Sequence, residues 1–442
     1  MLRDTWKRTE ARLEALAPNP RFRVGVAVAL VCLHLMAFAK AGHERLGVDF
    51  NNAPGEAPYY SDPDARALGG WPRQPHHWSR LIVSRWDAQH YIGFATRGLT
   101  SCPTDGATAT DRQYLDCGLA WLPAYGKVGG VIADVLHAPP DYALLGLSVV
   151  LAILLNFLWT SRTIVDRLGA GAAYGALIAF NAFPTGFFIV TPYPEGATIL
   201  LMLTGFLCLA NDRWILAGLA IGAGTALRPT AAAFAVALGC AAVYAAWTRR
   251  KAGTAGWWRP LIAIPISIWG QLLQTLILKI CVGDGRAYLR AHDAFAGGAG
   301  AKLKVTQMFD PEWYVLGFTA QHLDSIVMIA SFAMIALAGR EVLTRFKRQE
   351  SIFLVVATAV TMIMPLAAIT GYWGLNRYFL LAPLTFLCAG VVARKHTGLF
   401  ILWLVLSLAL YWNVELCSYI SHGDPHVCHC LGRVQVVEPW AS

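Results

Sequence analysis

The chain has 442 residues, of which 56% are hydrophobic and only 14% are charged, and its net charge is +9. Because soluble domains carry about 25% charged residues, this composition excludes an ordinary soluble protein and indicates an all-α polytopic membrane protein. The positive charge does not indicate a nucleic-acid partner, because Lys and Arg lie mostly between apolar blocks and no basic, aromatic platform stands outside them.

The N-terminal segment, residues 1–23, is basic, and residues 24–39 after it are almost wholly apolar. Ala37-Phe38-Ala39 imitates the cleavage site of a secretory signal peptide. The leader is long, however, and prolines interrupt it. We therefore expect residues 24–42 to be retained as the first transmembrane helix.

A polar segment follows, and we expect residues 43–140 to form a long first external loop with juxtamembrane helices. At 84–91 it contains SRWDAQHY. The carboxylate of Asp87 can accept a proton there while the neighbouring aromatic surface holds a sugar ring. We interpret Asp87 as the catalytic base of a membrane glycosyltransferase, with helix capping or a simple ion pair as the alternative. The neighbours expected to contact substrate are Arg85, Trp86 and His90.

Residues 119–138 are long enough to span a membrane but carry Pro123, two charged residues and three glycines. If they span, the basic turn 162–167 falls outside and every later loop inverts. If they lie along the interface, all the short basic loops fall inside together. The second arrangement is favoured.

With that arrangement, the chain has about eleven transmembrane helices. The first is followed by a core group in 141–282, then by a second external loop at 283–320, and finally by a C-terminal group in 321–414. The inside segments then hold nineteen Lys and Arg, against two in the short outside turns. This bias places the N-terminus in the cytoplasm and the tail, 415–442, outside. The later spans are predicted at 141–160, 170–190, 196–210, 214–227, 230–248, 260–281, 321–339, 352–370, 376–393 and 397–414.

This topology gathers the unusual polar residues on the outer face. Asp87, the 191–195 segment, Arg228, the 283–320 loop and the 376–378 segment all lie there. Burying an ionisable residue at the centre of a span costs about 2.5–3.5 kcal/mol, so a polar group at a span end usually marks a water-filled site. We expect a polar cavity at this face.

The family resemblance described below implies a lipid-phosphate donor, whose chemistry gives these residues roles. Its leaving phosphate needs cations at membrane depth, which Arg228 and Arg377 can offer, although both could instead snorkel from span ends. Such a leaving group needs little protonation, so one carboxylate base suffices. Glu195 is either functional or a helix cap. The other residues expected to bind substrate are Tyr378, Asp284, Arg290 and His292.

Ten cysteines are present. The separation of Cys102 and Cys117 suits a disulfide in an oxidising compartment, with two free thiols as the alternative. The tail offers soft metal ligands, but their spacing matches no established zinc pattern, so a disulfide is favoured. The tail residues concerned are Cys417, His422, His426, Cys428, His429 and Cys430. Five others, interpreted as small packing residues of spans, are Cys32, Cys208, Cys240, Cys281 and Cys388.

Four motifs occur in order between residues 80 and 390: SRWDAQHY, NAFPTGFFIVTPYPE at 181–195, the 214–231 segment, and GDGRAYLRAHDA at 283–294. They resemble the WDxxHY-type motif, the FP-x-x-FF…PY-x-E segment, the W-x-LAG…RPT segment and the GDP-x-AF-x-RAQ-x-A opening of the PIG-V-like mannosyltransferases of the GT-C superfamily.

The resemblance implies a GT-C-like fold and inverting transfer of a sugar, typically mannose, from a polyprenyl-phosphate donor to a glycolipid or glycan acceptor at the outer face. Asp87 would deprotonate the acceptor, and His90 and Trp86 would shape its pocket. Three departures leave acceptor and sugar open: Pro194-Glu195 where Thr-Glu is common, Gly285 where Pro is common, and AWLPAY in place of FPLYP. Assistance by a divalent cation is left open, and no metal ligand is assigned.

Short loops favour a bacterial plasma membrane, with the endoplasmic reticulum as the eukaryotic alternative. Two other functions stay open. A secondary transporter or flippase-like protein would also be polytopic, with prolines that break helices, although no inverted repeat is evident. A non-catalytic assembly factor would predict that Asp87 tolerates substitution.

Overall fold

The computed structural model describes residues 2–46, 87–298, 320–368 and 375–412, together with Leu416 and Tyr419. Within these ranges the regular secondary structure is helical and no strand occurs. Four helical stretches are long and apolar enough to cross a membrane. This agrees with the predicted all-α membrane protein, whereas the count of eleven spans stays a prediction. The four stretches are Pro20–Ala41, Pro140–Leu168, Pro229–Lys251 and Arg259–Val282.

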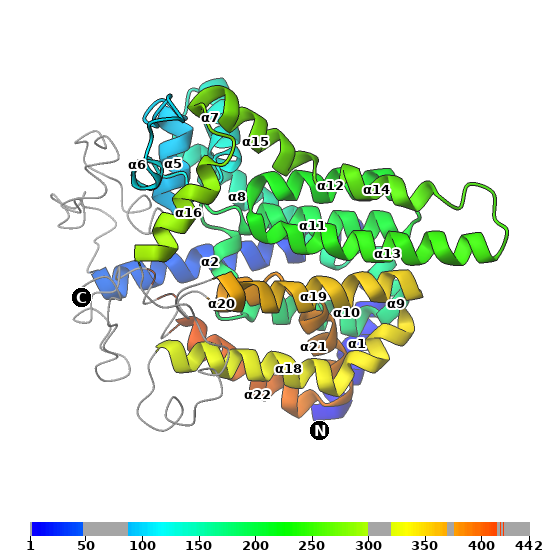
Figure 1. Cartoon of the computed structure of the whole chain (residues 1–442). Coiled ribbons are helices and arrows are strands. Elements are labelled where there is room, and N and C mark those ends of the chain that lie inside the picture. The colour runs from blue at the N-terminus through cyan, green and yellow to red at the C-terminus, as the bar shows by residue number, and fades with distance from the viewer. Residues whose placement is uncertain are drawn as a thin grey trace.

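The long helices run side by side as a bundle, with their axes roughly along one direction (Figure 1). Neighbouring helices in this bundle include the pairs α10 and α21, α11 and α12, and α13 and α19. The bundle helices are α2 (Pro20–Leu46), α8 (Pro140–Trp159), α10 (Ala170–Ala182), α11 (Glu195–Ala210), α12 (Trp214–Leu227), α13 (Ala232–Lys251), α15 (Trp269–Val282), α18 (Ala320–Arg345), α19 (Arg348–Ala368), α21 (Pro383–Lys395) and α22 (Thr397–Leu410).

Shorter helices lie at the ends of this bundle and, in the case of α14, along its side next to α12 and α13 (Figure 1). A cap of α5, α6, α7 and α16 covers one end, where α6 packs on α16 and α5 on α7. The short elements are α1 (Leu2–Leu16), α5 (Ala88–Arg97), α6 (Asp111–Asp116), α7 (Ala124–Leu136), α9 (Arg162–Leu168), η2 (Gly186–Ile189), η3 (Pro229–Ala231), η4 (Arg259–Ile262), α14 (Ala263–Ile266), α16 (Ala287–Gly298) and α20 (Leu375–Phe379).

Each predicted span contains a helix, but three are not continuous. The 170–190 segment leaves the α-helix after Ala182 and continues as the 3-10 helix η2. The 260–281 segment breaks between α14 and α15, around Ser267. The 376–393 segment divides into α20 and α21, because the chain leaves the helix at 380–382 and restarts with Pro383 at the first helical position. These breaks interrupt the helix within a span, and the 260–281 segment still lies in one of the four described stretches long and apolar enough to cross a membrane. Within 119–138 the helix α7 has 13 residues, about 20 Å at 1.5 Å per residue, which is short for a span and favours the interfacial arrangement.

Small residues let the bundle helices approach closely. A Cβ added to Gly390 of α21 would lie 2.1 Å from the carbonyl oxygen of Ala172 on α10, and one added to Gly270 of α15 would lie 2.1 Å from that of Gly222 on α12. Glycine is therefore required at both crossings, as is common where packing alone holds transmembrane helices together.

A buried polar cluster also ties the first span to the bundle. The His34 ring on α2 lies 2.8 Å from the hydroxyl of Tyr411 and 3.1 Å from Oδ1 of Asn181 on α10. Asn181 and Asn156 of α8 exchange further hydrogen bonds through their side-chain amides. Because each buried polar group has a partner, this cluster fixes the register of α2 against α8 and α10.

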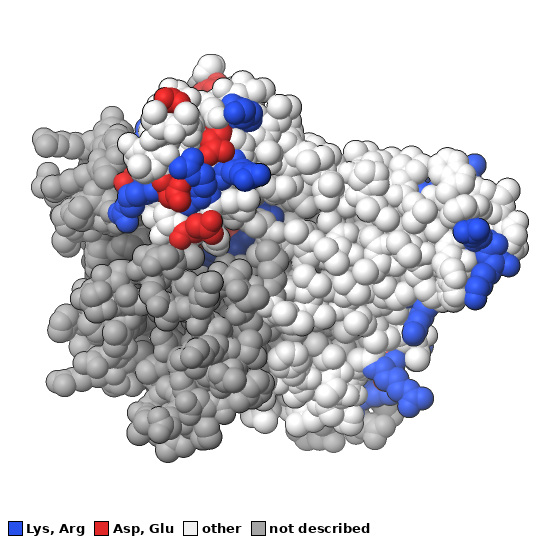
Figure 2. All heavy atoms as spheres, viewed as in Figure 1, with Lys and Arg blue, Asp and Glu red and all other residues white. Residues whose placement is uncertain are grey.

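The two ends of the bundle differ in charge. In Figure 2 the visible face of the end beyond α13 shows mainly Lys and Arg, although Asp212 pairs with Arg249 there, whereas the cap shows both signs close together. The cysteines that we interpreted as packing residues of spans differ in exposure. Cys388 is buried, as predicted, but Cys32, Cys240 and Cys281 are exposed, so the packing interpretation was wrong for those three.

Candidate active site

Four charged side chains from four separate segments meet where the cap joins the bundle. Arg377 donates from Nη1 to Oδ2 of Asp87 at 2.8 Å, and its Nε lies 2.8 Å from Oε1 of Glu195. Arg228 forms an ion pair with the same Glu195 oxygen. Two carboxylates and two guanidinium groups thus form one connected, electrically neutral network. We call Asp87, Glu195, Arg228 and Arg377 the charge network.

Local structure explains how each member reaches this point. Asp87 is the N-cap of α5, yet within the described chain its side chain makes no capping hydrogen bond and turns to Arg377 instead. Glu195 is the first residue of α11, where the helix dipole favours a carboxylate. Arg228 is extended, with φ −146° and ψ 140°, because it precedes Pro229.

Exposure increases across the network in one direction. The side chain of Glu195 is 0% exposed, Arg228 6%, Arg377 17% and Asp87 23%. Buried charges are costly unless they are paired, and here each charge has a partner of opposite sign. Asp87 is therefore the member best placed to meet a ligand from outside, while Glu195 is the inner anchor of both arginines.

Aromatic rings surround the two arginines. The guanidinium of Arg228 lies 5.3 Å from the Tyr378 ring centre, and that of Arg377 lies 5.2 Å from Phe188 and 5.3 Å from Tyr193. These are cation–π distances. The rings keep water away from the ion pairs and restrict the orientation of both guanidinium groups.

The charges set the protonation state of Asp87. Burial raises the pKa of this carboxyl, but Arg377, His90 and Arg228 outweigh that effect, so its pKa lies below the usual range. Asp87 is therefore ionised at neutral pH.

His90 lies one helical turn from Asp87 on α5. Its ring stacks on Trp121, with centroids 3.6 Å apart and an interplanar angle of 11°. Its Nδ1 atom is buried and has no hydrogen-bond partner among the described residues. Burial lowers the pKa of His90 to about 4, against the attraction of Asp87, so the imidazole is neutral at pH 7. A neutral ring nitrogen beside Asp87 can accept or donate one hydrogen bond to a ligand.

The predicted loop residues Asp284 and Arg290 form a different cluster. Arg290 lies 2.8 Å from Oδ2 of Asp284 and 2.5 Å from Oδ1 of Asp111, and it donates to the carbonyl oxygen of Ala109 at 2.6 Å. These bonds join α16 to the loop before α6. Both residues thus hold the cap together, and their role in substrate binding stays a prediction.

α16 also brings two rings toward the charge network. His292 stacks on Tyr288, with centroids 6.0 Å apart, and burial lowers the pKa of His292. Burial raises the pKa of Tyr288, whose hydroxyl lies near enough to Tyr378 and Arg228 to be influenced by both. α16 therefore lies beside the network.

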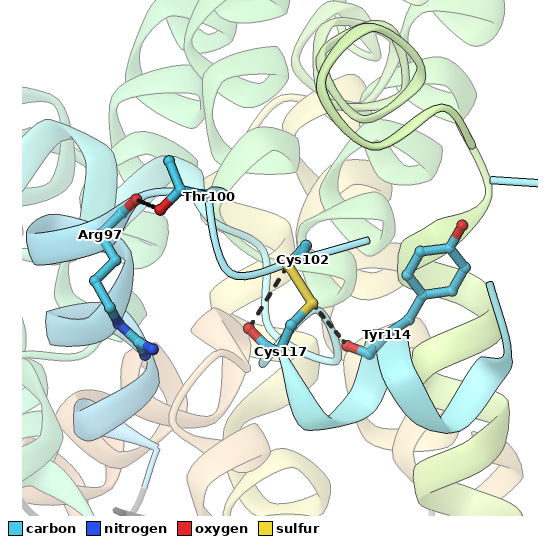
Figure 3. The surroundings of a disulfide bond; sticks show 5 residues. All are labelled: Arg97, Thr100, Cys102, Tyr114 and Cys117. Atoms are coloured by element: carbon cyan, nitrogen blue, oxygen red, sulfur yellow. Dashed lines mark hydrogen bonds between the residues drawn. A yellow bond between two sulfur atoms is a disulfide. The ribbon is translucent and has the colours of Figure 1, made fainter. Parts of the chain in front are cut away.

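A disulfide fixes the cap loop. Cys102 and Cys117 are joined, with their Cα atoms 5.1 Å apart (Figure 3). The bridge links the turn after α5 to the end of α6, next to Tyr114. Of the two alternatives left by the sequence, the structure has the disulfide.

The predicted site residues therefore separate into three groups. The structure brings together Asp87, His90, Glu195, Arg228, Arg377 and Tyr378. It places Asp284, Arg290 and His292 on the adjoining cap. Arg85 and Trp86 lie outside the described residues, as do the tail cysteines predicted to pair.

Sequence reasoning missed several rings of the site. Trp121 lies in the AWLPAY stretch, noticed only as a departure from the family pattern, and Tyr193 lies in the TPYPE segment. Phe188 belongs to the 181–195 motif. An aromatic residue inside a motif with charged neighbours was the available signal. Tyr288 carried the same signal, because it lies in the 283–294 motif between Arg286 and Arg290.

No group of three or more His, Cys, Asp or Glu suited to a metal ion occurs among the side chains that the structure describes. Comparison of the sequence with protein-family models gives no match, and comparison with curated proteins gives none either.

Proposed function

We propose that this protein is an inverting membrane glycosyltransferase of the GT-C type that takes its sugar, mannose in the first instance, from a polyprenyl-phosphate donor. The observation that carries the proposal is the charge network, in which Arg377 binds the ionised carboxylate of Asp87 near the surface and shares Glu195 with a second arginine, Arg228, deeper in the protein. A base for the acceptor and two cations for a phosphate are what this transfer needs.

In the proposed reaction the acceptor hydroxyl loses its proton to Asp87 while its oxygen attacks the anomeric carbon. The bond from that carbon to the phosphate oxygen breaks, and the electron pair leaves with polyprenyl phosphate. Attack opposite the leaving group inverts the anomeric carbon. The phosphate leaves as an anion, so no second carboxylic acid is required.

The ion pairs suggest how donor binding prepares the base. Without donor, Arg377 holds Asp87 at 2.8 Å and lowers its basicity. A donor phosphate competes with both carboxylates for the two guanidinium groups, which bind phosphate in a forked geometry. Withdrawal of Arg377 toward the phosphate raises the pKa of Asp87, so the base becomes stronger once donor is bound.

His90 and Trp121 supply an acceptor surface in this proposal. The stacked rings form a flat apolar face, and Nδ1 of His90 is free for an acceptor hydroxyl. A glycolipid or glycan acceptor suits this combination, because sugar rings pack on aromatic faces and are positioned by single polar atoms.

The proposed orientation has eleven spans, a cytoplasmic N-terminus and the cap outside, in a bacterial plasma membrane or in the endoplasmic reticulum of a eukaryote. The basic end beyond α13 supports it, because positive charge accumulates in cytoplasmic loops. The disulfide on the cap supports it too, because disulfides persist in oxidising compartments.

The experiment is transfer by purified, reconstituted protein supplied with polyprenyl-phosphate mannose and a panel of lipid acceptors. The proposal expects product whose new linkage has the opposite anomeric configuration. If no polyprenyl-phosphate sugar yields product with any acceptor, the proposal fails, and transport across the same vesicles is then the test of the transporter function.

A further inference from the structure

A groove of about 620 Å³ lies on the side of the bundle, away from the charge network. Its lining is almost entirely apolar and comes from one face of α13, closed on one side by Ile264 of α14. Val236, Val243 and Trp247 are about half exposed. The residues lining the groove are Val236, Gly239, Cys240, Val243, Tyr244, Trp247 and Ile264.

The lining residues continue into a basic patch. Val236, Cys240, Val243, Trp247 and Lys251 follow one another at helical spacing of three or four residues, so they form one stripe along α13. Nζ of Lys251 lies 4.0 Å from the ring centre of Trp247, the last residue of the groove. The groove therefore ends directly beneath a cation.

A second cation lies beside the first. The guanidinium of Arg250 lies 5.3 Å from the ring of Trp257, in the turn after α13. Arg249 is already paired with Asp212. Neither Arg250 nor Lys251 forms an ion pair with a carboxylate in the described part of the chain. Two exposed positive charges thus stand at the level of tryptophans, which favour the headgroup region of a membrane.

We propose that this groove binds one anionic phospholipid, with an acyl chain along Val236–Trp247 and the phosphate between Arg250 and Lys251. Each part of the ligand meets a matching surface: an apolar trough for the chain, an indole for the interface and two unpaired cations for the headgroup. A zwitterionic lipid would fill the trough but gain little from the cations. The proposal is independent of the proposed glycosyl transfer.

Cys240 allows direct measurement, because its thiol is exposed within the groove. Purified protein in a neutral detergent is alkylated with N-ethylmaleimide in the presence of phosphatidylglycerol or phosphatidylcholine, and the labelled cysteines are quantified by peptide mass spectrometry. Phosphatidylglycerol is expected to slow labelling of Cys240 several-fold at concentrations where phosphatidylcholine does not. Cys281, exposed on α15 outside the groove, is the internal control.

Two variants separate the headgroup from the chain. Replacing both Arg250 and Lys251 by Gln should weaken phosphatidylglycerol binding on the order of 25-fold, about fivefold for each charge removed. Gly239→Leu should block the trough, because the new side chain fills the open space of the groove. The fold should be undisturbed, because a Cβ at this position meets nothing within 4 Å. Bound lipid is then counted by native mass spectrometry. Gly146→Leu on α8, equally open, is the matched control.

Equal protection of Cys240 by the two lipids, or retention of phosphatidylglycerol by the charge variant, would overturn the proposal. So would protection by polyprenyl phosphate that depends on Gly239 and not on the two cations, because the groove would then hold an isoprenoid chain. Loss of lipid binding in Gly146→Leu would show that the measurement reports general damage, and would equally contradict a site at this groove.

Discussion

Arg377 donates a hydrogen bond to Asp87 at 2.8 Å, although 290 positions separate the two residues in the chain. The same guanidinium contacts Glu195 at the start of α11. This single side chain therefore connects the cap, which presents the carboxylate, with the bundle, which holds the inner charges. It explains why Asp87 does not cap its own helix.

The first prediction concerns the base. Asp87→Asn should lower kcat by about 10²- to 10⁴-fold, the usual contribution of a general base, because the amide cannot accept the acceptor proton. Transfer assays and thermal unfolding are measured together. Asp116→Asn, which removes an exposed ion pair with Arg112 on the same cap, is the control and should retain activity. An Asp87→Asn protein that transfers sugar as fast as the parent would remove this residue from the chemistry.

The second prediction concerns stability. Glu195→Gln leaves two buried guanidinium groups with only Asp87 as a carboxylate partner, and breaking a buried pair in this way costs about 3–5 kcal/mol. Thermal unfolding in detergent should therefore shift strongly downward. The matched change is Asp212→Asn, whose partner Arg249 lies at the exposed end of the bundle, where a pair contributes about 0–1 kcal/mol. Equal shifts in the two variants would contradict the inner role of Glu195.

The positions of most helices along the sequence were predictable, for a clear physical reason. A chain crossing a membrane must satisfy its backbone internally, so each apolar block becomes a helix. The predictions 141–160 and 214–227 agree closely with α8 and α12. The breaks at Ser267 and at 380–382 lie beside Pro265 and Pro383, and proline can break a helix. Hydropathy alone does not locate these breaks, because apolar residues lie on both sides of each.

The sequence predicted which charged residues belong to the site, but not which of them form ion pairs with each other. Placement at span ends was enough to select Glu195, Arg228 and Arg377, because ionisable residues are rare there. Which carboxylate meets which arginine depends on the packing of distant helices, and sequence spacing carries no information about it. For the same reason a polar loop cannot distinguish the Arg290–Asp284 ion pair, which holds the cap, from residues that bind substrate.

The third prediction is a pH dependence from His90. Its pKa is about 4 in the folded protein, because of burial, against about 6.5 when unfolded. The unfolded chain therefore binds more protons between these values, and stability is complete above pH 6.5 and falls as the pH drops toward 4. At pH 5 the loss is on the order of 1–2 kcal/mol.

The measurement compares unfolding of the parent and His90→Gln between pH 7 and pH 5. The groups around His90 that carry charge, Asp87 and Arg97, are present in both proteins, so the difference between the curves reports the imidazole. A smaller decrease for His90→Gln is expected. Parallel curves would show that His90 is not held neutral by its surroundings.

The fourth prediction concerns the Cys102–Cys117 bridge, which closes a loop with a sequence separation of 15. A loop of this length restricts the unfolded chain by about 3 kcal/mol in the chain-entropy description. Cys102→Ala should lower the unfolding temperature and make it insensitive to dithiothreitol, whereas reductant should destabilise the parent. Cys240→Ala, exposed on α13, should behave as the parent does. Peptide mapping that finds both thiols free in the purified parent would refute the bridge.

The last prediction separates the two arginines of the network. Replacing either arginine by Lys keeps the positive charge but loses the forked hydrogen bonds to the donor phosphate. Hydrogen bonds to charged groups contribute about 1.5–3 kcal/mol, so either replacement should raise the KM for the donor by about 10- to 100-fold. Arg377 lowers the pKa of Asp87 by its charge and by a direct hydrogen bond, whereas Arg228, which among the described carboxylates pairs with Glu195, lowers it by its charge, which Lys retains. Arg228→Lys should therefore leave the pH profile unchanged. Arg377→Lys should raise the pKa of Asp87 and move the acid limb of kcat/KM to higher pH. Identical pH profiles would show that Asp87 is not the group titrating in that limb, whatever the change in KM.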